Sequence, residues 1–208
     1  FHLACYNGEL YQNLANDFFS YVREINLKAK KKLIKLKYFE DVKNDIEGFF
    51  TKAKYLLEGN EKPNPDVTAM VSILNGCEKA SDILEKKSDF YTFLKSKGIE
   101  EDNYNAYFEI ENHEYNIVSQ DIIDKVSEEI GKDSAPFLRF LNYVSIRRKE
   151  ANSNNFENIR YLLLTGNSTT LKVAWNDLMK EEGYVPLASH LSFLTNKFWF
   201  KLNKGFGK

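Results

Sequence analysis

The spacing of apolar residues predicts helices over most of this chain. Apolar positions recur every three to four residues in several stretches, which is typical of amphipathic helices that bury one face. Local signals place some ends: Gly131 and Gly183 each close a helix, and Asp133 or Ser134 caps the next one, with Pro136 in its first turn. The predicted helices are 9–30, 37–57, 66–84, a piece around Phe90 ending at Gly98, 119–130, one entered at Asp133, and 169–183.

Short apolar runs predict a few strands. The run Tyr161–Leu164 meets the turn Thr165-Gly166-Asn167 and then a helical pattern. A buried strand that feeds a helix is the building unit of open α/β sheets, which place ligands at the carboxyl ends of their strands. Weaker strand signals are Leu33–Leu36, Tyr107–Ile110 and an edge strand at Tyr184–Leu187. The predicted fold class is therefore α/β and helix-rich, with a mostly α-helical domain as the alternative.

The length of 208 residues suits a single domain with a full core. Residues 59–118 are predicted to form a helical and loop insertion within it. This stretch opens with the turn-rich GNEKPNP and ends in an acidic segment rich in Asn and Tyr. No internal repeat of solenoid length is visible in the sequence.

The amino-acid composition indicates which compartment and which kinds of partner suit the protein. The formal net charge is -1, so a nucleic acid or membrane partner would have to be held by local charge. Cys5 and Cys77 make neither a disulfide framework nor a metal spacing, which favours a reducing, cytoplasmic environment. No apolar run approaches the roughly 20 residues that a membrane span needs. Because the chain starts at Phe1 without a methionine, we expect further residues upstream.

A run of lysines follows the first predicted helix. Six lysines stand between Lys28 and Lys37. Lys35 and Lys37, together with Arg147 and Arg148 on a later helix, are candidate contacts to a nucleic-acid backbone. The alternative is a solvated face or the guard of a sheet edge.

Oxygen ligands are the remaining candidates for chemistry. The sequence has no phosphate-binding glycine loop, no zinc grouping and no serine nucleophile elbow. Asp45 borders an apolar helix face, Asp133 stands at a helix entrance, and Asn167 with Ser168 occupies the strand-to-helix turn. Such groups suit Mg²⁺ or Mn²⁺. Each also has an ordinary role: Asp45 as a rim residue paired with a cation, and the others as helix caps.

The order of four segments resembles that of the PIN-like nucleases, particularly longer bacterial members with helical insertions. The segments are YFEDVKNDIEGFF, KDSAPFLRFLNYVSIRR, RYLLLTGNSTTLKVAW and VPLASHLSFLTNKFWF, and they span about Leu33 to Phe200. The resemblance implies a short, mostly parallel sheet flanked by helices. It also implies acids at the carboxyl edge of that sheet, which bind magnesium or manganese and hydrolyse RNA, often single-stranded.

Carried over by position, the resemblance makes Asp45 and Asp133 the metal ligands. Asn167 stands where the family usually has aspartate, and with Ser168 it would position metal-bound water or phosphate. The aspartate that ends the family's first strand has no counterpart near Phe1 and would lie upstream. The expected function is therefore a metal-dependent endoribonuclease acting on single-stranded RNA, in a truncated or degenerate form.

A non-catalytic, helix-rich interaction or regulatory domain is the alternative function. Several predicted helices carry wide apolar stripes, and one of these could be buried against a protein partner or a second copy of the chain. In that case the polar candidates would serve only as caps and rim pairs.

Overall fold

A computed structural model describes residues 9–149 and 151–202. The chain divides into two compact units, one formed by residues up to Asn103 together with those from Thr195 onward, the other by Tyr104–Leu194. The boundary at Asn103 falls inside the predicted insertion 59–118. Each unit is helix-rich and carries one parallel pair of strands, which agrees with a helix-rich α/β fold.

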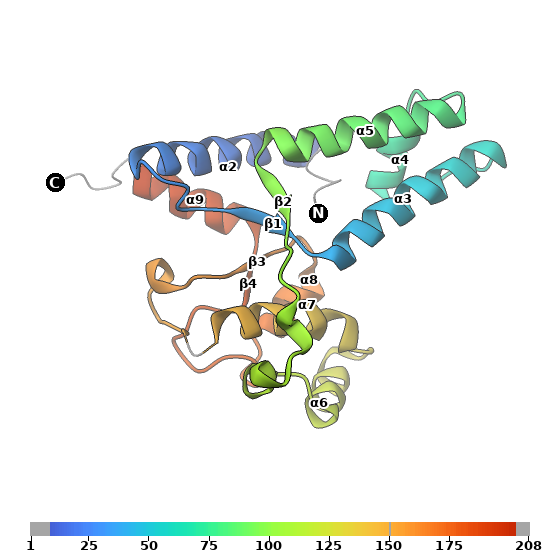
Figure 1. The fold of residues 1–208 in the computed structure, drawn as a ribbon. Coiled ribbons are helices and arrows are strands. Elements are labelled where there is room, and N and C mark those ends of the chain that lie inside the picture. The colour runs from blue at the N-terminus through green and yellow to red at the C-terminus, as the bar shows by residue number, and fades with distance from the viewer. Residues whose placement is uncertain (1–8, 150, 203–208) are drawn as a thin grey trace. The chain divides into compact units, whose positions relative to one another are not determined.

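The first unit consists mainly of helices, which Figure 1 labels, and its core is rich in aromatic side chains. Phe50 of α3 and Phe90 of α5 lie with ring centroids 6.1 Å apart, and both side chains are buried. Phe18 of α2 stacks on Phe198 of α9 at 5.8 Å. These contacts bury the apolar stripes that the sequence pattern predicts. The helices are α2 (Glu9–Lys28), α3 (Glu40–Glu58), α4 (Thr68–Leu74), α5 (Ala80–Ser96) and the part of α9 (Leu191–Leu202) from Thr195.

The sheet of the first unit pairs β1 (Leu36–Tyr38) with β2 (Ile99–Glu101) in parallel. β1 begins at the last residue of the predicted strand Leu33–Leu36. The predicted strand Tyr107–Ile110 is wrong: that stretch belongs to the 3-10 turns η1 (Ala106–Phe108) and η2 (Ile110–Tyr115). β2 lies earlier, directly after Gly98, whose φ of +68° turns the chain out of α5.

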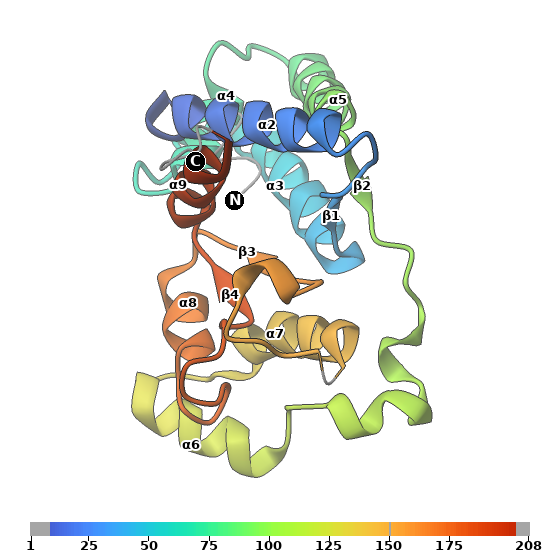
Figure 2. The ribbon, with the colours of Figure 1, turned by 90° about the vertical axis from the view of Figure 1, so that its left-hand side faces the viewer.

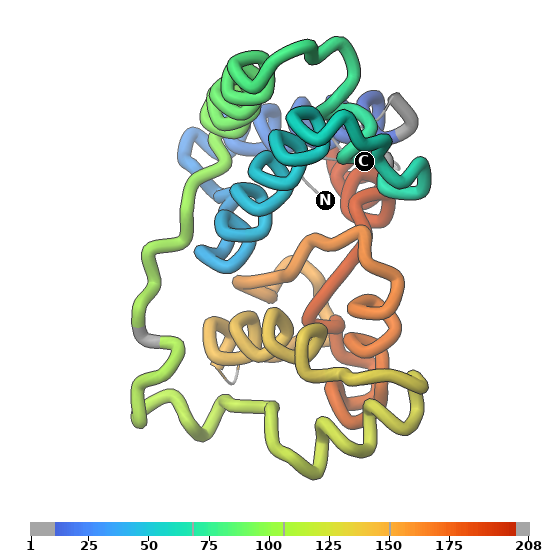
Figure 3. The backbone as a smooth tube through the Cα atoms, turned by 90° about the vertical axis from the view of Figure 1, so that its right-hand side faces the viewer, coloured from blue at the N-terminus to red at the C-terminus, as the bar shows by residue number. Residues whose placement is uncertain are grey.

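In the second unit, α7 (Ala135–Arg148) is the central helix (Figure 2). Its residues Leu138 and Leu141 are fully buried, and the helix contacts α6 (Gln120–Ile130), α8 (Ser168–Ala174) and β3 (Leu163–Leu164). β3 pairs in parallel with β4 (Ala188–Ser189). The two 3-10 turns η1 and η2 precede α6 in the green part of the tube (Figure 3), and η3 (Phe156–Asn158) precedes β3.

Local capping signals place α6 and α7 as predicted. Ser119 accepts a hydrogen bond from the Ile122 amide at the start of α6, and Gly131 ends that helix at φ +71°. α8 differs, because it ends at Ala174 instead of running to Gly183. The side chain of Asn176 accepts a hydrogen bond from the Leu178 amide at 2.8 Å, and this local turn replaces the continued helix.

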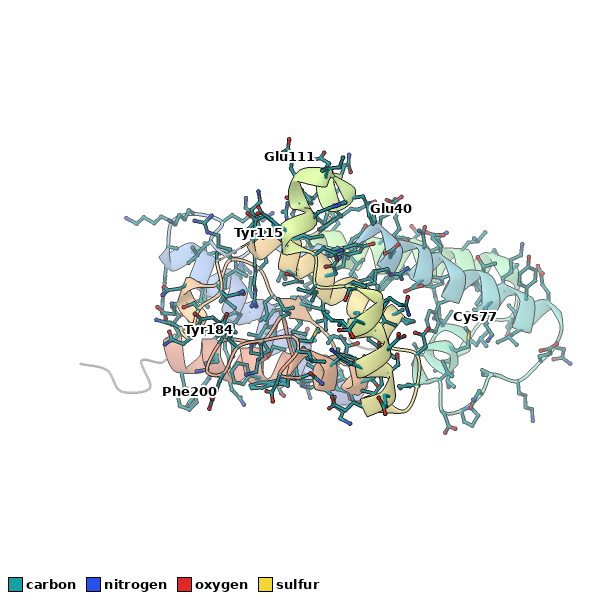
Figure 4. The ribbon with its side chains drawn as sticks, turned by 90° about the horizontal axis from the view of Figure 1, so that it is seen from below. Glu40, Cys77, Glu111, Tyr115, Tyr184 and Phe200 are labelled. Atoms are coloured by element: carbon teal, nitrogen blue, oxygen red, sulfur yellow. The ribbon has the colours of Figure 1, made fainter. Side chains whose placement is uncertain are left out.

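Cys77 lies between α4 and α5 in the first unit (Figure 4). Its thiol donates a hydrogen bond to the Ile73 carbonyl at 3.2 Å. Cys5 lies outside the described residues. Of the helices in the described ranges, none combines the length and the apolar character that a membrane crossing demands.

Candidate nucleic-acid interface

The two predicted metal ligands belong to different units. Asp45 is an exposed residue in the middle of α3, next to the buried Ile46 in the first unit. Asp133 lies in the second unit, also exposed, just before α7. Its Oδ1 accepts a hydrogen bond from the Ala135 amide at 3.0 Å. The side chain of Asp133 therefore binds the first backbone amide of α7, which agrees with the capping role given above as the alternative to metal binding.

Asn167 and Ser168 occupy the turn between β3 and α8, as the sequence predicts. Asn167 is the N-cap of α8, and its Oδ1 accepts a hydrogen bond from the Thr170 amide at 3.0 Å. Ser168 is the first residue of the helix, and both side chains are exposed. Asp133 and this turn thus share the second unit, each bonded to the start of a different helix.

No group of three or more His, Cys, Asp or Glu side chains able to hold a metal ion occurs within the described ranges. Oδ1 of Asp133 and Oδ1 of Asn167 each accept a hydrogen bond from a backbone amide. The predicted ligands Asp45 and Asp133 lie in different units, and we derive no reaction step through a metal ion.

Arg148 has a structural role in place of the predicted nucleic-acid contact. Its side chain is only 2% exposed and donates three hydrogen bonds to backbone carbonyls, at Tyr161 (2.7 Å), Val185 (2.9 Å) and Pro186 (2.7 Å). Burial lowers the pKa of the guanidinium to about 10. The edge strand predicted at Tyr184–Leu187 is wrong: the Val185 and Pro186 carbonyls accept hydrogen bonds from Arg148, and β4 comprises Ala188–Ser189. A side chain held in this way offers nothing to a phosphate.

Arg147 packs between two tyrosine rings of the second unit. The centre of its guanidinium lies 4.1 Å from the ring centroid of Tyr104 and 4.6 Å from that of Tyr161. Guanidinium groups stack favourably on aromatic faces. Arg147 is half-buried by this packing.

The lysine run is partly neutralised by two acids, one in β2 and one directly after it. Lys37 pairs with Asp102 at 2.8 Å, and Lys32 pairs with Glu100 at 2.7 Å. These pairs link the run to Glu100 of β2 and to Asp102 directly after it. Lys35 is exposed, and no carboxylate pairs with it among the described residues.

Lys30, Lys31 and Lys32 of the run line a groove of about 780 Å³ in the first unit, whereas Lys28 lies outside its lining and pairs with Glu24. The groove runs along α2, the connection from α2 to β1, and the end of α5, elements that Figure 1 labels. Its volume lies within the range of ligand sites. No Asp or Glu is among its lining residues. The cations that line it are Arg23, Lys30, Lys31, Lys32 and Lys97.

The groove also has apolar lining. Phe19, Val22, Leu27, Ile34 and Leu36 contribute to its surface. The ammonium of Lys97 lies 5.5 Å from the ring centroid of Phe19, so a cation and an aromatic face meet at one end. The sequence shows the lysines, but residues 16–36 and 96–98 become one surface only when the unit folds.

Comparisons with known proteins add no relative to this picture. No protein-family model matches the chain, and neither a curated protein nor a solved structure is significantly similar to it.

Proposed function

We propose that this protein binds single-stranded RNA in the basic groove of its first unit. The observation that carries the proposal is a groove lined by five cations and by no carboxylate, in a chain whose net charge is -1. Such a concentration of one charge attracts a polyanion locally, although the whole molecule does not.

The mixture of charge and apolar surface favours a single strand. Proteins that bind single strands combine a positive groove that follows the backbone with aromatic and apolar surface for the bases. Phe19 and Leu27 give the groove such surface beside Arg23 and Lys31. In a duplex the bases are already stacked and paired, so only the phosphates would be available to this lining.

Binding of a fluorescent oligouridine to the full chain, followed by anisotropy, tests the proposal. We expect the charge-reversal pair Arg23→Glu and Lys31→Glu to weaken binding roughly tenfold or more and to lower the dependence of log K on log salt by about 1.4. The matched control reverses Lys52 and Lys62, two exposed lysines of the same unit outside the groove lining. It changes net charge equally and should leave the affinity within about twofold, because distant exposed charges are screened.

Two results would overturn the proposal. One is the absence of saturable binding by the unmodified chain. The other is an equal loss in both double variants, which would mean that net charge and not the groove governs binding. Oligodeoxythymidine in a parallel titration separates recognition of RNA from recognition of any single strand.

As a second proposal, drawn from the resemblance to PIN-like nucleases, we infer that the second unit has that family's architecture and hydrolyses single-stranded RNA. In its favour, β3 leads directly into α8 through a turn that exposes Asn167 and Ser168 at the carboxyl end of a parallel strand. Manganese-dependent cleavage of single-stranded RNA should be lost in Asp133→Ala and retained in Asp121→Ala, an exposed aspartate paired with Lys125 on α6. Equal activity in both variants refutes the assignment. If the unmodified chain binds RNA but does not cleave it, the protein is a non-catalytic interaction domain.

A further inference from the structure

The connection between α2 and β1 is closed by one side chain. The amide Nδ2 of Asn26 donates a hydrogen bond to the Ile34 carbonyl at 2.9 Å, and the Ile34 amide donates one to Asn26 Oδ1 at 2.7 Å. Both backbone polar groups of Ile34 are thereby bound to a residue eight positions earlier. Asn26 and Ile34 also line the basic groove.

Within the closed segment, Lys30 has a conformation that lysine rarely adopts. Its φ is +52°, in the left-handed region where a helix usually ends on glycine. Its amide donates to the Leu27 carbonyl at 3.1 Å, and the Lys31 amide donates to the Asn26 carbonyl at 3.3 Å. A lysine at this position costs conformational free energy that a glycine would avoid. The turn nevertheless places cations at consecutive positions 30, 31 and 32 on the groove.

We propose that Asn26 is a positioning residue that holds 27–33 as a preformed basic rim for the RNA backbone. This inference rests on the proposed function. A flexible segment would lose conformational entropy each time it bound, whereas a segment already closed by Asn26 binds without that cost. Asn26 therefore acts on affinity through the lysines and need not touch the RNA.

A positioning residue and a contact residue differ in their salt dependence. Asn26→Ala frees the loop but removes no charge, so we expect binding to weaken about tenfold while the salt slope stays at the value of the unmodified chain. Lys30→Gly removes one phosphate contact and lowers the slope by about 0.7. It also relieves the backbone strain, so its Tm should rise while its affinity falls. A purely structural role of Lys30 would move Tm and affinity in the same direction.

Asn13→Ala is the matched control for Asn26→Ala. Asn13 lies on the same helix and is exposed, but it is not among the residues that line the groove. Oligouridine binding is measured at a temperature at which circular dichroism shows all variants folded. We expect Asn13→Ala to bind as the unmodified chain does. If Asn26→Ala also binds with unchanged affinity, or if both variants lose equally, the positioning role is refuted.

Amide hydrogen exchange of the unmodified chain tests the preformed rim without any substitution. Because Ile34 donates to Asn26, its amide should be protected in the free protein and equally protected with oligouridine bound. Protection that appears only with RNA would mean that the ligand orders the loop, which overturns the inference even if Asn26→Ala fails to fold. Failure of the unmodified chain to bind oligouridine instead refutes the proposed function itself.

Discussion

Replacing Arg148 by methionine should destabilise the second unit without affecting RNA binding. The guanidinium joins the end of α7 to two other segments, through the Tyr161 carbonyl before β3 and the Val185 and Pro186 carbonyls before β4. Methionine is similarly long and apolar, so it fills the buried space but donates no hydrogen bond. The substitution therefore isolates the contribution of the three hydrogen bonds and of the charge.

The expected magnitude follows from two opposing terms. Each carbonyl left without its donor costs about 1–3 kcal/mol, and the lower figure applies to Tyr161 and Val185, whose bonds are only partly buried. In the opposite direction, methionine carries no charge, so the free-energy cost of burying the guanidinium charge disappears. This cost lowers the pKa of Arg148 to about 10 and corresponds to roughly 3 kcal/mol. The three carbonyls together cost about 3–5 kcal/mol. Subtracting the recovered desolvation leaves an expected net loss of up to about 2 kcal/mol.

Urea unfolding combined with amide exchange across 104–194 measures this loss. Arg139→Met is the control, because Arg139 is an exposed arginine of the same helix, and its replacement should cost about 0.5–1 kcal/mol at most. The oligouridine affinity of folded Arg148→Met should equal that of the unmodified chain. A variant with unchanged stability but weakened RNA binding would refute the structural role and restore the contact that the sequence predicts.

Substitutions at three further positions test other parts of the structure. Burial by itself raises the pKa of Glu47, but hydrogen bonds from Lys87 and Tyr91 lower it below its usual range. The ionised form therefore stabilises the fold above pH about 4.3, and this stabilisation disappears as the pH falls through the lowered pKa. Glu47→Gln should flatten that dependence in urea midpoints measured against pH. Asn167→Ala should cost about 1 kcal/mol by removing the cap of α8, whereas Asn167→Asp should retain it; thermal unfolding distinguishes the two. Glu100→Gln should free the groove lysine that it pairs with and strengthen oligouridine binding roughly twofold by anisotropy, whereas weaker binding would contradict the groove model.

Sequence alone determined the features that depend on neighbouring residues. The start of α6 at Ser119, its end at Gly131 and the cap of α8 at Asn167 involve hydrogen bonds that span at most four positions. The recurrence of apolar residues every three to four positions likewise predicted the helix-rich character, because one turn of an α-helix takes 3.6 residues. These signals are contained within a few residues of chain, so the sequence displays them directly.

Only the tertiary structure decided which charged residues are available to a ligand. Arg148 looks like a phosphate contact until folding brings carbonyls 13, 37 and 38 positions away around its guanidinium. Lys37 is engaged by Asp102, 65 positions later, whereas Lys30 and Lys31 remain on the groove with Lys97. Each outcome depends on segments that are distant along the chain. Those pairings cannot be predicted from residue types and local spacing, because the packing of the whole unit determines them.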